Sequence, residues 1–175
     1  NSDYVSDYSP GTHIGLPYDW GGYMSISEFD REIAAGYGAG SHSWDGILSC
    51  TAGVDCSGFV SMVWETDHYS TSTFYSVTHD INASDVKAAD AYNDPGSHIT
   101  LFAYETQAGE PIFYEASGSA SQVRVNSSSG WSYLSGYDPV RFDNITDTPT
   151  PTGTTSHPIE ITAFPYYDQR WTAGA

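Results

Sequence analysis

The first half of the chain contains a stretch in which apolar residues recur at helical spacing behind a polar start. Ser25-Ile26-Ser27-Glu28 has the pattern of a capping box, with Ser25 as the N-cap residue and Glu28 three positions later. We predict that this helix runs to about Ala35. Gly36 follows as its stop, because glycine commonly occurs just after the last helical turn.

A second helical stretch follows a polar turn and consists mainly of the apolar run Phe59-Val60-Ser61-Met62-Val63-Trp64. It predicts a helix from Ser57 to about Thr66. The other predictions for this half are a long loop rich in glycine and serine over 36–54, β structure over 71–77 and a short helix over 83–89.

The second half of the chain changes to short apolar runs separated by turn residues, a pattern that predicts an antiparallel meander. The predicted strands are 98–105, 110–116, 121–126 and 137–142. Helices followed by a meander predict an α+β fold, in which the N-terminal helices pack on the sheet.

Composition divides the chain into three parts. Residues 1–145 are long enough to form one domain with its own core. Residues 146–157 are rich in proline and threonine, which is typical of a linker. Residues 158–175 are interpreted as a tail that begins a further domain.

The chain is strongly acidic, with 22 Asp and Glu against 5 Lys and Arg and a formal net charge of −17. This charge repels nucleic acid and anionic lipid, so we expect neither as a partner. No apolar run approaches the roughly 20 residues that cross a bilayer, so we expect no membrane insertion. The acidic balance and a start without methionine predict a secreted, mature protein, and we expect a monomer.

Cys56 is the strongest candidate for chemistry because it lies where a polar turn meets the second helix. Unpaired backbone N–H groups and the positive end of the helix dipole favour an anion at that place. The thiolate is the nucleophilic form of cysteine. We therefore predict that Cys56 is a nucleophile, which needs a base and a group that orients the base.

His98 is the best candidate for the base. It follows the turn Asp94-Pro95-Gly96-Ser97 and opens an apolar strand, so its side chain is expected at the edge of a sheet, facing a cleft. Glu115 lies on the next predicted strand, and directly opposite residues of antiparallel strands are about 5 Å apart at Cβ. Glu115 is therefore predicted to accept a hydrogen bond from the imidazole and fix its tautomer.

No metal or other cofactor is expected. The two cysteines, Cys50 and Cys56, form no Cys-x-x-Cys pair. The histidines other than His98 are interpreted as surface residues because they form no close pair: His13, His42, His68, His79 and His157. Cys50 either pairs with Cys56 in an oxidising compartment or is free, and we favour the free form.

Four short segments, in this order, resemble the NlpC family of papain-like cell-wall peptidases. They are Pro17-Tyr18-Asp19-Trp20-Gly21-Gly22, Asp55-Cys56-Ser57-Gly58-Phe59-Val60, Gly96-Ser97-His98-Ile99 and Tyr114-Glu115-Ala116. The resemblance covers most of residues 12–142 and implies a papain-like fold. It also implies an exported bacterial cysteine hydrolase.

The resemblance implies cleavage of amide bonds in peptidoglycan stem peptides, of the γ-D-glutamyl to diamino-acid type in many members. By position, Cys56 would be the nucleophile, His98 the base and Glu115 the orienting residue. The residues implied in binding the stem peptide are Tyr18, Trp20, Asp55 and Ser57. The alternatives are an N-acetylmuramoyl-alanine amidase or CHAP-like amidase and, in another class, a non-catalytic module that binds cell wall or glycan.

The chain departs from the family pattern in two places. The segment between Gly22 and Asp55 is 32 residues long and is expected to form a wall of the cleft. The third residue is Glu115, where many members have histidine. It also lies farther from His98 along the chain than is usual.

Overall fold

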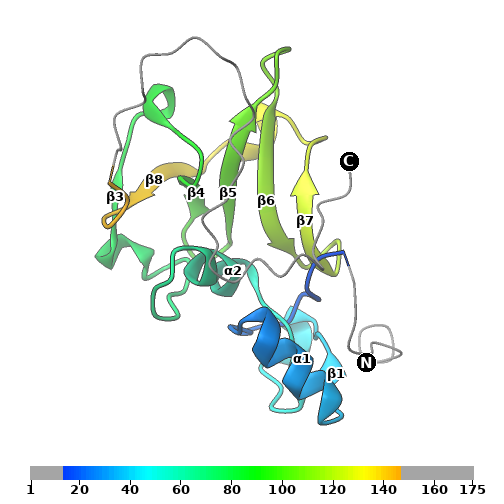
Figure 1. Ribbon diagram of the computed structural model, residues 1–175. Coiled ribbons are helices and arrows are strands. Elements are labelled where there is room, and N and C mark those ends of the chain that lie inside the picture. Colours follow the sequence, from blue (N-terminus) through cyan, green and yellow to red (C-terminus); the bar gives the residue numbers. More distant parts are fainter. Residues whose placement is uncertain (1–13, 147–175) are drawn as a thin grey trace.

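Strands from the second half of the chain form an antiparallel sheet of six strands within residues 14–146, the part of the chain that this computed structural model describes (Figure 1). The strands are β3 (Thr78–Asp80), β4 (Ala91–Asp94), β5 (His98–Glu105), β6 (Pro111–Ser117), β7 (Gln122–Asn126) and β8 (Asp138–Phe142). Their order in the sheet is β3-β8-β4-β5-β6-β7. The predicted α+β class and antiparallel sheet are confirmed.

The helix that begins with the cysteine, α2 (Cys56–Val63), packs against β5 and β6 near one end of the sheet (Figure 1). Its core contacts include Val60, which is fully buried, together with Ile99 and Leu101 of β5. Asp55 caps the helix, and Glu65, with a φ of 51°, lies just beyond its last residues. The helix is therefore one residue longer at its start and about three shorter at its end than the sequence pattern predicts.

The helix α1 (Ile26–Ala34) lies apart from the six-stranded sheet, so the prediction that the N-terminal helices pack on the sheet is wrong for this helix and holds only for α2. The predicted capping box of α1 is present. The side chain of Ser25 accepts a hydrogen bond from the backbone of Glu28, whose carboxylate accepts one from the N–H of Ser25 at 2.8 Å. Gly36 follows the helix at a φ of 92°, a conformation that favours glycine. Phe29 and Ile33 form the buried face of the helix.

Several predictions for the first half are wrong in detail. The segment 36–54 is not one loop, because β1 (Gly38–Ala39) and β2 (Thr51–Ala52) pair in parallel within it. The segment predicted as β structure holds a 3₁₀ turn at Phe74–Ser76, and the predicted helix over 83–89 is a 3₁₀ turn at Ala83–Asp85. Each of these pieces is too short to carry a periodic pattern of its own.

The predicted meander is only partly correct. Strands β4 to β7 follow one another in the sheet, but β8 returns to lie between β3 and β4. The sequence pattern missed β4 because its first three residues, Ala91, Tyr92 and Asn93, are all buried, so no polar face alternates with an apolar one. Residues buried on both faces carry no period of two.

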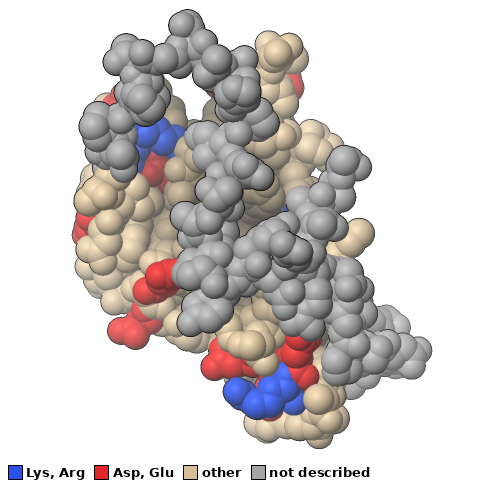
Figure 2. Space-filling view, viewed as in Figure 1, with Lys and Arg blue, Asp and Glu red and all other residues tan. Residues whose placement is uncertain are grey.

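Acidic side chains are spread over the face of the molecule seen in Figure 2, where few basic side chains are visible. In residues 14–146, no helix is long and apolar enough to cross a membrane. The predicted linker, apart from Thr146, and the predicted tail 158–175 lie outside the described residues.

Candidate active site

The cysteine predicted as nucleophile is the first residue of α2, and its side chain lies at the junction of the helix and the sheet. Its exposed fraction is only 6%, so a substrate would have to fit closely around the sulfur. The backbone N–H groups of the first helical turn have no intrahelical acceptor; Asp55 caps that of Gly58, and those of Cys56 and Ser57 are placed to bind a developing negative charge. The predicted position of Cys56 at a helix N-terminus is therefore observed.

His98 contacts both of its predicted partners. Burial lowers the pKa of His98, but the side chain of Cys56 lies close enough to its imidazole to raise this pKa, both as a hydrogen-bond partner and as a charge. On its other side, Nε2 donates to Oε2 of Glu115 at 2.8 Å, so Nδ1 is the nitrogen left to face the sulfur. The structure therefore brings Cys56, His98 and Glu115 into one row, although the first two are 42 positions apart along the chain (98 − 56).

The pairing of β5 with β6 explains how Glu115 reaches His98. Leu101 lies opposite Tyr114, so the next pair in the same register is Thr100 with Glu115. His98 lies two residues before Thr100 in β5, so the two residues are on the same face of the sheet. The two side chains are thus diagonal neighbours and not directly opposite, and diagonal positions remain within reach of long side chains.

Glu115 is fully buried and is surrounded by hydrogen-bond donors from three elements. Its Oε1 accepts from Nε and Nη2 of Arg124 at 2.9 and 2.8 Å and from Nδ2 of Asn126 at 3.0 Å. Its Oε2 accepts from the hydroxyl of Tyr133 at 2.8 Å as well as from His98. A buried carboxylate requires such partners, because an unpaired buried charge is very costly.

These contacts hold the imidazole and the carboxylate in their charged forms. Burial opposes the charge on His98, but the hydrogen bonds to Cys56 and Glu115 and their negative charges outweigh it and raise the pKa of His98 to about 9. Burial likewise opposes the charge on Glu115, yet its hydrogen bonds from His98, Arg124 and Tyr133 lower its pKa to about 2. Near neutral pH the carboxylate is therefore an acceptor only and the imidazole is a cation.

Two tyrosines that the sequence analysis did not select lie beside this row. Burial, and then the negative charge of Glu115, raise the pKa of Tyr133, so its hydroxyl stays a donor. Tyr137 approaches the imidazole of His98 edge-on, with ring centroids 6.5 Å apart and an interplanar angle of 85°. Burial is also the main cause of the raised pKa of Tyr137.

Asp55 and Ser57, which the resemblance implies in substrate binding, are both engaged in holding the start of α2. Oδ1 of Asp55 accepts from the N–H of Gly58 at 2.7 Å and from the hydroxyl of Ser57 at 2.8 Å. Its Oδ2 accepts from the N–H of Gly21 at 3.0 Å. These bonds tie the segment around Gly21 to the cysteine helix, and a contact with a substrate amine stays a prediction.

Tyr18 and Trp20, the other residues implied in substrate binding, differ in burial. Tyr18 is 6% exposed, bridges Val54 next to the cap of α2, and packs its ring against Gly118. Trp20 is 39% exposed, and its backbone N–H donates to the hydroxyl of Ser41 at 3.1 Å. Trp20 takes no part in the hydrogen bonds of the Cys56 row, and its side chain is open to a partner from outside.

The two cysteines are not bonded to each other. Cys50 is exposed and Cys56 is buried, and both are free thiols. The favoured interpretation of Cys50 as a free residue agrees with this structure.

Arg124, Asn126 and Tyr133 were not found by the sequence analysis, although one signal was available. Arg124 is one of only five basic residues in a chain with a net charge of −17, and it sits in a strand next to the one that carries Glu115. Arg124 and Glu115 are direct partners in the pairing of β6 with β7. Tyr133 gave no such signal, because it comes from a 3₁₀ turn of four residues, Trp131–Leu134.

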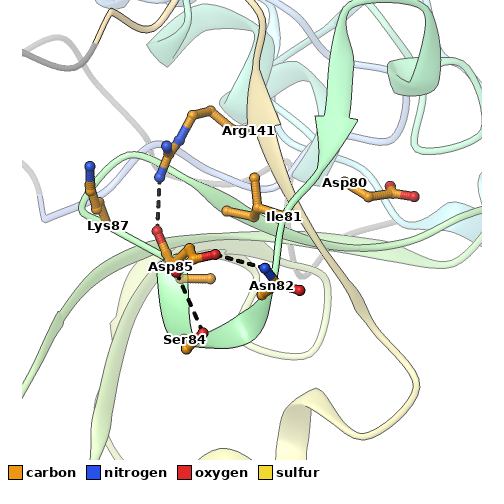
Figure 3. Close-up of a pocket in the computed structure, with 8 residues that line it drawn as sticks. Asp80, Ile81, Asn82, Ser84, Asp85, Lys87 and Arg141 are labelled. Atoms are coloured by element: carbon orange, nitrogen blue, oxygen red, sulfur yellow. Dashed lines mark hydrogen bonds between the residues drawn. The ribbon is translucent and has the colours of Figure 1, made fainter.

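A pocket of about 640 Å³ lies elsewhere, between the end of β3 and strand β8 (Figure 3). Its lining includes Asp85, Arg141 and Lys87 and shares no residue with the Cys56 row. Arg141 already makes two hydrogen bonds to the buried carboxylate of Asp90 and one to the backbone oxygen of Asp85. Since the polar groups of this pocket bind one another, we assign no function to it.

Within the described residues, no group of histidine, cysteine and acidic side chains has the arrangement of a metal site. Comparison of the chain with protein-family models, with curated proteins and with solved structures gave no match.

Proposed function

We propose that this protein is a cysteine hydrolase of papain-like fold, secreted or held in the cell envelope of a bacterium, that cleaves amide bonds in peptidoglycan stem peptides. The bond we propose is the one between γ-D-glutamate and the diamino acid. One observation carries the reaction type: the row of sulfur, imidazole and buried carboxylate at the start of α2. The substrate class comes from the resemblance to the NlpC family.

The first half of the proposed reaction forms a thioester. The Cys56 sulfur attacks the carbonyl carbon of the amide, and the oxygen becomes an anion that the N–H groups at the start of α2 stabilise. The C–N bond then breaks, and the leaving amine takes the proton that His98 carries. The acyl group remains on sulfur, and the imidazole is now neutral.

The second half restores the protein. Water gives a proton to His98 and attacks the thioester carbonyl, the C–S bond breaks, and a carboxylic acid leaves. Sulfur and imidazole return to their starting forms. Glu115 keeps its charge throughout, since its role is to orient the imidazole and stabilise the imidazolium and not to move a proton.

The proposal is tested by digesting purified sacculi and identifying the fragments by mass spectrometry. The native protein is expected to release stem-peptide fragments, and Cys56→Ala is expected to release none. Cys50→Ala is the matched control, because it removes an exposed thiol outside the row and is expected to keep the native fragment pattern. Identical fragment patterns for the native protein and Cys56→Ala would refute the hydrolase proposal and favour the binding module.

The fragments also separate the enzyme alternatives. A new amine on the diamino acid supports the proposed bond. Free muramic acid carboxyl groups would instead identify an amidase acting between the glycan and the stem peptide.

A further inference from the structure

The carboxylate of Glu115 divides its two oxygens between two sets of donors. Within the described residues, Oε1 accepts from two N–H groups of Arg124 and one of Asn126, at 2.8–3.0 Å. Oε2 accepts from the imidazole of His98 and the hydroxyl of Tyr133, each at 2.8 Å. Oε1 therefore anchors the carboxylate to β7, and Oε2 is the oxygen that meets the base.

Tyr133 consequently acts at the same atom as His98. A carboxylate oxygen has two lone pairs, and these two donors occupy them. With one lone pair taken by the phenol, the imidazole N–H has a single direction from which to approach. The two donors also share the negative charge of that oxygen, so removal of one strengthens the hold of Oε2 on the other.

Tyr137 extends this contact to the imidazole ring itself. The ring centroids of Tyr133 and Tyr137 are 5.8 Å apart, and, after burial and Glu115, the interaction of the two side chains contributes to the raised pKa of Tyr133. The ring of Tyr137 makes a T-shaped contact with the imidazole of His98. The imidazole is therefore held both by its hydrogen bond to Glu115 and by an aromatic contact.

We propose that Tyr133 and Tyr137 are positioning residues that hold the Glu115 carboxylate and the His98 imidazole in line with Cys56. The inference rests on the proposed function. The segment between β7 and β8 that carries both tyrosines is itself fixed, because Leu134 is buried among Tyr92, Phe102 and Phe113 on the face of the sheet opposite α2. A rigid support of this kind is what a precise hydrogen-bond geometry requires.

Other titratable groups also surround the imidazole, and the test has to separate their effects. They are Cys56 from α2, Asp94, which pairs with His98 across β4 and β5, Glu115 from β6, Arg124 from β7, and the two tyrosines. Variants at Tyr133 and Asn126 leave all the charged groups of this set in place, so they report on hydrogen bonding alone.

The experiment measures the rate at which a small electrophile alkylates Cys56 as a function of pH, in a Cys50→Ala background so that one thiol reacts. A step in this profile marks the pH at which His98 loses its proton. Tyr133→Phe is expected to move the step upward by on the order of half a pH unit, because Oε2 then interacts with His98 alone. The kcat on stem-peptide fragments is expected to fall about tenfold at unchanged KM, as the imidazole loses its fixed direction.

Three further variants keep the result interpretable. Asn126→Leu removes one donor from Oε1 and is expected to move the step less than half as far. Tyr137→Phe removes the second phenol hydroxyl and is expected to act in the same direction as Tyr133→Phe, but more weakly. It also replaces Tyr133→Phe as the test if that variant fails to fold. Tyr104→Phe, on an exposed position of β5, is expected to change nothing.

Each of the remaining outcomes would contradict one part of the proposal. A lower melting temperature with an unmoved step would make Tyr133 a structural residue only. Equal shifts for Tyr133→Phe and Asn126→Leu would refute the separate roles of the two oxygens. If Cys56 of the parent protein reacts no faster than the same thiol in the unfolded chain, the proposed function fails, and this inference fails with it.

Discussion

The sheet and the segment 23–54 differ in the kind of side chain that each buries or exposes. The sheet buries two carboxylates almost completely, Glu115 and Asp90, and pairs each with an arginine. The segment 23–54 instead leaves large apolar side chains in contact with solvent, above all Trp44 at 75% and Ile47 at 77% exposure. One region thus protects charge from water, and the other presents apolar surface to it.

This contrast follows from how much structure surrounds each region. In the sheet, every side of a buried carboxylate can be covered by a neighbouring strand or turn. The parallel pair of β1 and β2 has only two residues in each strand, and its buried residues Ala39 and Ala52 pack in a small cluster with Phe29 and Ile33 of α1. Such a region cannot hold a buried charge in place, but it can present a surface for contact. We therefore expect catalytic geometry to depend on the sheet and substrate contacts to depend on 23–54.

The largest difference between the regions is expected from removing a carboxylate charge in each. Glu115→Gln places an amide among donors that need an acceptor and leaves Arg124 without its partner, so the free energy of unfolding is expected to fall by about 3 kcal/mol. Glu32→Gln, which removes an exposed ion pair with Arg31, is expected to change it by less than about 0.5 kcal/mol. Urea denaturation measures both, and equal losses would contradict the contrast.

The pH dependence of stability is expected to originate in the sheet. The pKa of His98 is raised to about 9, so its contribution is complete below about pH 6.5 and is lost as the pH rises through 9. The pKa of Glu115 is lowered to about 2, so its contribution is present above about pH 4.5 and is lost as the pH falls through 2. Denaturation at a series of pH values should place the greatest contribution of this pair between pH 4.5 and 6.5.

A single substitution tests the cause of the alkaline loss. Cys56→Ser removes one of the two groups that raise the pKa of His98, so the loss should be smaller and should be complete at a lower pH. An alkaline edge that stays in place would mean that Cys56 does not stabilise the imidazolium.

Substitution of the N-cap residues of the two helices is expected to have effects of intermediate size on stability. Asp55 is buried and accepts three hydrogen bonds, so Asp55→Ala is expected to cost about 2 kcal/mol and to slow the reactions of Cys56. Ser25 caps α1 on the exposed side of the molecule, and Ser25→Ala is expected to cost about 1 kcal/mol with no change at Cys56. Thermal denaturation and alkylation rates measure the two effects, and a greater cost at Ser25 would reverse the comparison.

The smallest effects on stability are expected at the exposed apolar residues. Trp44→Ala and Ile47→Ala should each change the free energy of unfolding by less than about 0.5 kcal/mol, because little of either side chain is buried. If 23–54 contacts the substrate, the same variants should raise KM severalfold at unchanged kcat. An unchanged KM would leave the region with no part in substrate binding.

The sequence predicted those parts of the fold that carry a repeated or capped pattern. The capping box at Ser25 located α1, and alternating runs located β5 to β8 to within a residue or two. The place of β8 could not be predicted in this way, because the pattern of a strand shows which faces are buried but not which neighbour it pairs with. Short elements without a period, such as β1 and β2, were also not predictable.

The candidate site divides in a similar way. Cys56 and His98 stand out because each follows a sharp turn and opens an element, and a carboxylate within an apolar strand stood out because it needs a partner. Arg124 and Tyr133 supply that partnership from a strand and from a turn, and their meeting depends on register and on tertiary packing. The sequence thus predicted that Glu115 had to be paired, but it identified only one of its partners.

The place of β8 has a consequence for the biosynthesis of this protein. Because β8 separates β3 from β4, the interior of the sheet stays open until residues 138–142 have emerged from the ribosome. Tyr137, the ring beside His98, arrives immediately before them. A nascent or prematurely terminated chain that already contains Cys56, His98 and Glu115 therefore lacks a finished reaction centre. In a producing cell, this order of synthesis would delay the proposed hydrolysis until translation of the domain is complete.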